Sequence, residues 1–257
     1  MNTLKSFDLN GKVSIITGGG DGLGQMMAIG LAEAGSDIVI CSRRLEKCES
    51  AANEIEKLGV KTLAAQCDLN SDEDLDRLVI DTMKKFGKID VLVNNSGLTW
   101  GSPPEDMKME NWQKVIDVNI TGTFRCTQKV GREMIRKKNG KIINISSVAG
   151  LGGTNPEYLD ALPYNTSKGA LMVFTKDLAV KWAKYNINVN CIAPGWFPTK
   201  MTKWTLENRR DLLLDRFLIK RFGNEDDIKG AVVFLASKAS DYVTGQILNV
   251  DGGSSAW

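Results

Sequence analysis

The chain has 257 residues, of which 42% are hydrophobic and 25% are charged, as expected for a soluble globular protein with a sizeable core. Lysine and arginine total 33 against 31 acidic residues, and this net charge of +2 gives no reason to expect a nucleic acid or an anionic membrane as a partner. Histidine is absent, which excludes histidine-based catalytic triads and histidine-ligated metal sites, and we expect no metal.

Nothing in the sequence indicates a membrane anchor or a secretory leader. The first residues include Lys5 and Asp8 and lack an apolar run of signal-peptide length, and no later run approaches the length of a membrane span. Five cysteines are scattered without paired or metal-ligand spacing, which is typical of buried free thiols in a reducing compartment. We therefore expect a cytoplasmic protein.

Short runs rich in apolar and β-branched residues alternate with helical patterns along the chain, without a linker or an internal repeat. The runs that predict strands cover residues 13–17, 37–41, 61–67, 90–94, 141–145, 188–192 and 246–250. This alternation predicts one α/β domain, 1–257, built on a doubly wound (Rossmann), mostly parallel seven-stranded sheet. In such sheets ligands bind at the carboxyl ends of the strands.

The first predicted strand is followed at once by a glycine-rich turn and then by an apolar-periodic helix that ends at Gly35. Gly18, Gly22 and Gly24 let backbone amides approach a pyrophosphate and direct the N-terminus of that helix at its negative charge. Strand, glycine turn and helix occur in the order of a phosphate-binding site, so the pattern predicts nucleotide binding.

The second predicted strand ends in Ser42, Arg43 and Arg44, where an acidic side chain that binds a ribose 2′-hydroxyl would otherwise be expected. Arginine there suits a 2′-phosphate, and the alternative is a pair of solvated arginines at a helix start. Asp21 in the glycine turn works against a 2′-phosphate, unless its carboxylate turns outward or pairs with Arg43 or Arg44.

Tyr164 and Lys168 stand at the head of a helical pattern, four residues apart and therefore on one face. A free phenol with a pKa of about 10 is nearly inert at neutral pH, and a fixed positive neighbour favours its phenolate. The pair predicts a tuned acid/base, and a solvated lysine on a helix surface is the alternative.

Asn119 lies in the middle of a long helix predicted around residues 112–136. Asparagine is a poor helix former, because its side chain competes for backbone hydrogen bonds. We expect it to cap a kink or to hydrogen-bond a neighbour.

Six motifs in order along essentially the whole chain resemble those of the short-chain dehydrogenases/reductases. They are the segments 17–24 and 94–97, Asn119, Ser147, and the segments 164–168 and 194–199. The resemblance implies a nicotinamide cofactor and a substrate that is interconverted between a ketone and a secondary alcohol. The chain is most similar to members described as gluconate 5-dehydrogenases or 3-oxoacyl carrier-protein reductases, so the expected substrate is a sugar acid or a 3-oxoacyl thioester.

The resemblance also implies catalytic roles. Tyr164 is the expected acid that protonates the ketone oxygen, and Lys168 is expected to lower its pKa and to hold the nicotinamide ribose. Ser147, rather than Ser146, is the expected hydroxyl that polarises the carbonyl, and Asn119 is similar to the residue that positions a proton-relay water. These residues would supply the proton and the oxyanion partner, while the cofactor supplies the hydride.

For the cofactor, the resemblance implies that Thr199 holds the nicotinamide carboxamide, Asp68 faces the adenine and Asn95 shapes the wall between cofactor and sheet. The expected cofactor contacts are Gly18, Gly20, Asp21, Gly22, Leu23, Gly24, Ser42, Arg43, Arg44, Asp68, Leu69, Asn95, Ser96, Gly97, Tyr164, Lys168, Pro194, Gly195, Phe197, Thr199 and Met201. With arginine at the strand end, NADP(H) is expected in preference to NAD(H).

Two segments are expected to shape the substrate site: a helical lid at about 196–222, and the loop 151–163, which is about four residues longer than in the usual family pattern. The rival interpretation is a non-enzymatic cofactor sensor or scaffold on the same fold. An epimerase or dehydratase is disfavoured, because members of those classes look like longer chains with an extra substrate domain, for which 257 residues leave little room.

The resemblance further implies a homotetramer, built from the helices that carry Asn119 and Tyr164 and from the C-terminal strand, with the end 254–257 covered by a neighbour. A carrier protein is a doubtful partner. Of the two positions that resemble its docking patch, Lys138 is basic and Tyr185 is not, although Lys184 adjoins it.

Overall fold

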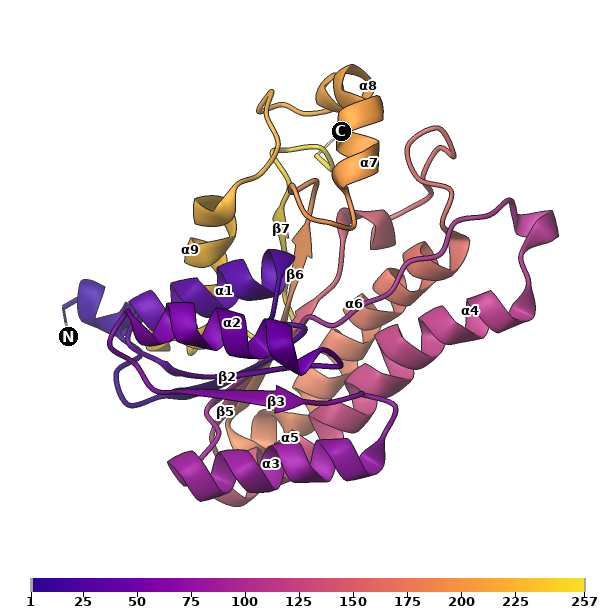
Figure 1. Cartoon of the computed structure of the whole chain (residues 1–257). Helices are drawn as coiled ribbons and strands as arrows, with labels where there is room; N and C mark the ends of the chain where they lie inside the picture. Colours follow the sequence, from indigo (N-terminus) through magenta and orange to yellow (C-terminus); the bar gives the residue numbers. More distant parts are fainter. Residues whose placement is uncertain (1, 257) are drawn as a thin grey trace.

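A seven-stranded sheet forms the centre of the computed structural model, which describes residues 2–256, and its strands lie in the order β3-β2-β1-β4-β5-β6-β7 (Figure 1). The strands are β1 (Val13–Thr17), β2 (Asp37–Ser42), β3 (Thr62–Gln66), β4 (Val91–Asn94), β5 (Gly140–Ile145), β6 (Ile187–Pro194) and β7 (Ile247–Val250). Neighbouring strands pair in parallel throughout, which confirms the predicted fold class and makes the sheet wholly rather than mostly parallel.

Helices cover both faces of the sheet. They are α1 (Gly22–Glu33), α2 (Leu45–Glu56), α3 (Asp72–Phe86), α4 (Met109–Ile116), α5 (Thr123–Lys137), α6 (Leu162–Trp182), α7 (Lys203–Asn208), α8 (Arg210–Leu214) and α9 (Glu225–Ala236). Helices α1, α2 and α9 pack on one face, and α3, α5 and α6 pack on the other. Adjacent residues of β1 serve the two layers, since Ile16 faces the first and Ile15 the second.

The strand order reverses at β1, which pairs with β2 on one side and with β4 on the other. Chain connections leave this point in opposite directions, so the loops at the carboxyl ends of β1 and β4 separate and open a crevice. All five residues of β1 are buried, as expected for a strand covered on both faces.

Helix α3 has a capping side chain at its start and a glycine at its end. The Ser71 hydroxyl accepts a hydrogen bond of 3.1 Å from the Asp74 amide, and Gly87 ends the helix with φ of 73°. Within residues 2–256 no helix has both the length and the apolar character needed to cross a membrane.

Candidate active site

Two adjoining cavities open at the carboxyl ends of the strands. The larger cavity, of about 670 Å³, runs along the glycine turn and past the ends of β2 and β4. The smaller cavity, of about 320 Å³, lies beyond the end of β5. Tyr164 lines both, so its phenol stands where the two cavities meet.

The glycine turn after β1 is packed too closely to admit other side chains. A Cβ placed on Gly24 would lie 2.3 Å from the carbonyl oxygen of Gly18, and Gly18 itself has φ of +65°. Asn95 holds the turn from β4, because its amide donates to the carbonyls of Thr17 at 3.0 Å and Gly18 at 3.2 Å. Helix α1 begins directly behind the turn, so its positive end faces the larger cavity.

A cluster of cations surrounds Asp21 at one end of the larger cavity. The Asp21 carboxylate pairs with Lys47 and lies 3.6 Å from Arg44 and 3.8 Å from Lys200. Arg43 lines the same end. The pairing with Arg44 was one sequence-based alternative, whereas Lys47 and Lys200 were missed. Lys47 lies in the first turn of α2, three residues after Arg44, and this spacing could have indicated that the two side chains face the same site.

Tyr164 and Lys168 occupy the first turns of α6, and the Lys168 ammonium lies 5.5 Å from the centre of the Tyr164 ring. The ammonium donates to the carbonyl of Ile145 at 2.7 Å. Burial lowers the pKa of Lys168 to about 8. Burial also raises the pKa of Tyr164, against a smaller lowering by the Ser147 hydroxyl. Burial is the larger of these two causes, and the expectation that Lys168 lowers the pKa of Tyr164 stays a prediction.

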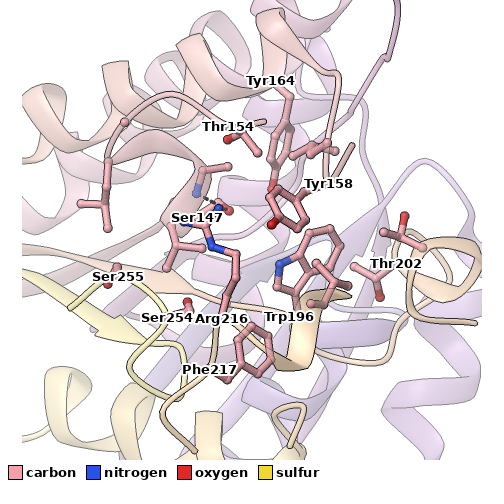
Figure 2. A pocket seen from close by; sticks show the side chains of 18 of the residues that line it. Ser147, Thr154, Tyr158, Tyr164, Trp196, Thr202, Arg216, Phe217, Ser254 and Ser255 are labelled. Atoms are coloured by element: carbon pink, nitrogen blue, oxygen red, sulfur yellow. Dashed lines mark hydrogen bonds between the residues drawn. The ribbon is translucent and has the colours of Figure 1, made fainter. Parts of the chain in front are cut away.

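The two serines after β5 have different surroundings. The Ser147 hydroxyl accepts from the Ala149 amide at 3.2 Å and lines the smaller cavity beside Tyr164 (Figure 2). Ser146 is 3% exposed and donates to the carbonyl of Lys168 at 2.6 Å, so its hydroxyl serves to hold α6 against β5. Only Ser147 has its hydroxyl beside the phenol on the smaller cavity.

Asn119 lies in a π-helical segment, Asp117–Gly122, that joins α4 to α5 without a break in the helical path. Its carboxamide accepts from the Leu98 amide at 2.8 Å and donates to the Leu98 carbonyl at 2.9 Å and to the Ser167 hydroxyl at 2.8 Å. Asn119 thus ties the loop after β4 to α6, and the π-helical turn is where the helix accommodates it.

Most expected cofactor contacts line the larger cavity. They are Gly18, Gly20, Asp21, Gly22, Leu23, Gly24, Ser42, Arg43, Arg44, Asp68, Leu69, Asn95, Ser96, Gly97, Tyr164, Lys168, Thr199 and Met201. Gly195 lines the smaller cavity instead, Pro194 is buried at the end of β6, and Phe197 is 2% exposed and contacts the core. With its glycine turn, its cations at one end and its phenol and ammonium at the other, the larger cavity fits a nicotinamide dinucleotide.

The smaller cavity is walled by the loop 151–163 and by the segment 196–222, which contains α7 and α8. From these segments come Leu151, Gly152, Gly153, Thr154, Tyr158, Leu159, Trp196, Met201, Thr202, Thr205, Leu213, Arg216 and Phe217. Ser254 and Ser255 close the cavity near the C-terminus, and Trp257, part of the end expected to be covered by a neighbour, lies outside the described residues. The sequence did not single out Tyr158 or Arg216. These two residues are distant in the sequence, and only the tertiary structure brings them together at the smaller cavity.

Comparison with known proteins places this chain in one family. The family model of the short chain dehydrogenases matches residues 12–210. The chain is 40% identical over 253 residues to a 2-dehydro-3-deoxy-D-gluconate 5-dehydrogenase of Dickeya dadantii, an alignment that covers 97% of this chain and 98% of the relative. It is 37% identical over 246 residues to a 3-oxoacyl-(acyl-carrier-protein) reductase of Aquifex aeolicus, covering 95% and 98%.

Solved structures agree with this placement. A gluconate 5-dehydrogenase of Burkholderia cenocepacia, crystallised with NADP and tartrate, superposes with a TM-score of 0.94 at 36% identity and complete coverage, 100% of both chains. The chain belongs to the short-chain dehydrogenase/reductase family, and it is an oxidoreductase enzyme.

Proposed function

We propose that the protein is an NADP(H)-dependent oxidoreductase that interconverts a ketone and a secondary alcohol of a sugar acid. The observation that carries this proposal is the position of Tyr164, which lines both cavities beside Ser147 and Lys168. A proton donor at that junction can reach a carbonyl in the smaller cavity while a cofactor occupies the larger one.

The bound nicotinamide cofactor supplies or accepts the hydride. Tyr164 donates the proton to the ketone oxygen during reduction, and its raised pKa keeps the phenol protonated at neutral pH. The Ser147 hydroxyl, on the same cavity wall, hydrogen-bonds the carbonyl oxygen as negative charge develops there.

Lys168 and Asn119 return the proton to Tyr164. A methyl group built on Gly97 would lie 3.5 Å from the Lys168 ammonium and 3.7 Å from the Asn119 carboxamide oxygen, so both groups face one small space. Once the ammonium has given up a proton toward the Tyr164 phenolate, a water in that space can pass a proton from solvent to the neutral amine that is left. Because the pKa of Lys168 is about 8, the ammonium releases a proton more readily than an exposed lysine does.

The preference for NADP(H) over NAD(H) rests on charge. Arg43, Arg44, Lys47 and Lys200 bring four cations to the end of the larger cavity where Asp21 brings one carboxylate. Because Asp21 is paired with three of these cations, its repulsion of a 2′-phosphate is largely offset. The relative that was crystallised with NADP supports the same preference.

A sugar acid fits the smaller cavity better than an acyl thioester. Hydroxyl side chains are spread around its wall, namely Thr99, Ser147, Thr154, Tyr158, Tyr164, Thr202, Thr205, Ser254 and Ser255. Such a wall can hydrogen-bond several hydroxyl groups of a sugar. The positions similar to a carrier-protein patch, Lys138 and Tyr185, precede β5 and β6, at the end of the sheet opposite the site.

The test is an NADPH-oxidation assay with three ketones: the 5-ketone of gluconate, acetoacetyl-coenzyme A and cyclohexanone. We expect the highest kcat/KM with the sugar acid. A higher kcat/KM with the thioester would select the alternative substrate class. Cofactor binding without turnover of any of the three ketones would overturn the proposed substrate class.

We also propose a tetramer of two-fold symmetry. Helices α5 and α6 expose large apolar side chains that a monomer would leave in water: Phe124 is 48% exposed, Val173 68% and Val180 79%. Helix α4 packs against α6, so the three helices present a continuous surface to a second copy.

A cytoplasmic location is the third proposal. The five cysteines are buried free thiols, as expected in a reducing compartment. Fractionation that recovers the protein outside the cytoplasm would contradict it.

A further inference from the structure

The hydroxyl group of Thr154, on the wall of the smaller cavity, is held by a hydrogen bond that it accepts. The amide nitrogen of Asn165 donates to the Thr154 Oγ1 at 3.0 Å. Thr202, on the same wall, is held in the opposite way, because its hydroxyl donates to the carbonyl of Phe197 at 2.5 Å. The hydrogen of the Thr202 hydroxyl is therefore already used, whereas that of Thr154 is not.

Within residues 2–256, the bond from Asn165 is the only hydrogen bond that the Thr154 hydroxyl makes. A hydroxyl group has one hydrogen to donate and two lone pairs that accept, so the donor of Thr154 stays available. A hydroxyl that accepts a hydrogen bond is also polarised into a better donor. Thr154 is therefore a hydrogen-bond donor of fixed position on the wall of the smaller cavity.

The residue that holds Thr154 directly follows the expected acid in the sequence. Asn165 and Tyr164 are consecutive residues in the first turn of α6, so the hydrogen bond of Asn165 ties the loop 151–163 to the helical turn that carries the phenol. Thr154 and Tyr164 both line the smaller cavity, and Figure 2 shows them on the same side of it. A carbonyl oxygen at the phenol would thus bring the neighbouring part of the substrate to Thr154.

We propose that Thr154, positioned by Asn165, donates a hydrogen bond to a hydroxyl oxygen on a carbon next to the reacting carbonyl. The enzyme would then select α-hydroxy ketones over ketones that lack this group. The inference rests on the proposed function and adds which part of the sugar acid is recognised near the reacting carbon.

Selection of this kind follows from the cost of an unpaired donor. A site that hydrogen-bonds a substrate hydroxyl disfavours the analogue without it, because the polar group of the protein then loses water and gains no partner. Thr154 would act on specificity through this contact, and Asn165 would act through Thr154.

The experiment compares the 5-ketone of gluconate with its 4-deoxy and 6-deoxy analogues, each of which lacks one hydroxyl next to the carbonyl. Thr154→Val keeps the shape of the side chain and removes the hydroxyl, Thr154→Ser keeps the hydroxyl, and Asn165→Leu removes the amide that holds it. The matched control is Thr127→Val. The Thr127 hydroxyl also accepts from an asparagine amide, that of Asn94 at 2.8 Å, and lines neither the larger nor the smaller cavity.

The wild type should prefer the parent ketone to at least one deoxy analogue by roughly tenfold in kcat/KM. Thr154→Val should abolish that preference through loss of activity on the parent ketone, and Thr154→Ser should keep it. Asn165→Leu should reduce the preference, because the hydroxyl is no longer fixed, and Thr127→Val should keep all of it. The Kd for NADPH should be the same in all five proteins, which also checks folding.

A preference that survives in Thr154→Val would show that the hydrogen of this hydroxyl points elsewhere. An equal loss on the parent ketone and the analogue would show that Thr154 only holds the loop. Either result would overturn the inference while the proposed function stands, and an unchanged preference in Asn165→Leu would overturn the positioning by Asn165. A wild type that reduces acetoacetyl-coenzyme A but none of the sugar acids would overturn the proposed substrate class, and the role of Thr154 with it.

Discussion

Ser147 and Ser146 follow β5 directly, but only the first has a predicted role in the reaction, whereas the second has a structural role. They are adjacent in the sequence, yet one hydroxyl lines the smaller cavity beside Tyr164 and the other is buried against α6. Alternation along an extended chain points neighbouring side chains in opposite directions, which accounts for the difference. Replacing Ser147 by alanine should therefore affect turnover, and replacing Ser146 by alanine should affect stability.

Ser147→Ala should lower kcat for ketone reduction by about 100-fold or more, since an oxyanion partner is lost. Ser146→Ala should leave kcat nearly unchanged and lower the free energy of unfolding by about 1 kcal/mol, the typical contribution of one hydrogen bond. Steady-state kinetics and urea denaturation measure the two effects. The opposite pattern would mean that Ser146 polarises the carbonyl.

The buried ammonium of Lys168 lowers the free energy of unfolding, because burial removes its water. Its pKa falls from 10.5 to about 8 on folding, so the unfolded chain binds the extra proton between these values and stability rises with pH across that window. Below pH 8 the whole penalty is present, about 3 kcal/mol by the conversion of pKa to free energy.

Lys168→Met should therefore stabilise the protein at pH 7 by about 1–3 kcal/mol, after the lost hydrogen bond to Ile145 is counted, while it abolishes turnover. The gain over wild type should shrink as the pH rises from 8 to 10.5. Denaturation of both proteins at several pH values checks this. A variant less stable than wild type at pH 7 would show that the ammonium contributes more to the fold than its burial costs.

The loop between β1 and α1 and the start of α2 form the part of the site that should select the cofactor. Asp21 from the loop and Lys47 from α2 form an ion pair on the wall of the larger cavity, and Lys200 joins it from the segment after β6. A 2′-phosphate would compete with Asp21 for these cations. The preference for NADPH over NADH should therefore depend on the charges that all three segments contribute, and not on Arg43 alone.

Arg43→Ala and Lys47→Met should each lower the ratio of kcat/KM for NADPH to that for NADH by about tenfold to a hundredfold, since each removes one charge-assisted hydrogen bond to the phosphate. Lys57→Met, at the far end of α2, is the control and should keep the ratio. A wild type that prefers NADH, or an unchanged ratio in Arg43→Ala, would refute this account of the cation cluster.

The strands were largely predictable, because most of them are short apolar runs closed by a polar or glycine-rich turn. The π-helical turn at Asn119 was not, since it depends on partners at Leu98 and Ser167 that are distant in the sequence. Arg216 and Lys200 escaped prediction for the same reason. They come from irregular stretches of the segment 196–222, where no periodicity indicates which side chains face the site.

Assembly should follow from the apolar face of α5 and α6. Val173→Asp combined with Val180→Asp places charges on that face and should convert the proposed tetramer into smaller species, because burying unpaired carboxylates is costly. Ile80→Asp on α3, a side chain 63% exposed in the chain, should leave the tetramer intact. Light scattering at micromolar concentration measures both, and a monomeric wild type would refute the proposed assembly.

The fold brings the glycine turn, Tyr164 and the wall of the smaller cavity together at one edge of the sheet, and Tyr164 lines both cavities. The most direct measurement is the turnover of Tyr164→Phe with NADPH and the 5-ketone of gluconate, together with its Kd for NADPH. The ring still packs on Lys168 but has no proton to give, so kcat should fall by at least about 10²–10⁴-fold with the Kd unchanged. A variant that turns over at nearly the wild-type rate would show that the proton comes from elsewhere and would contradict the account.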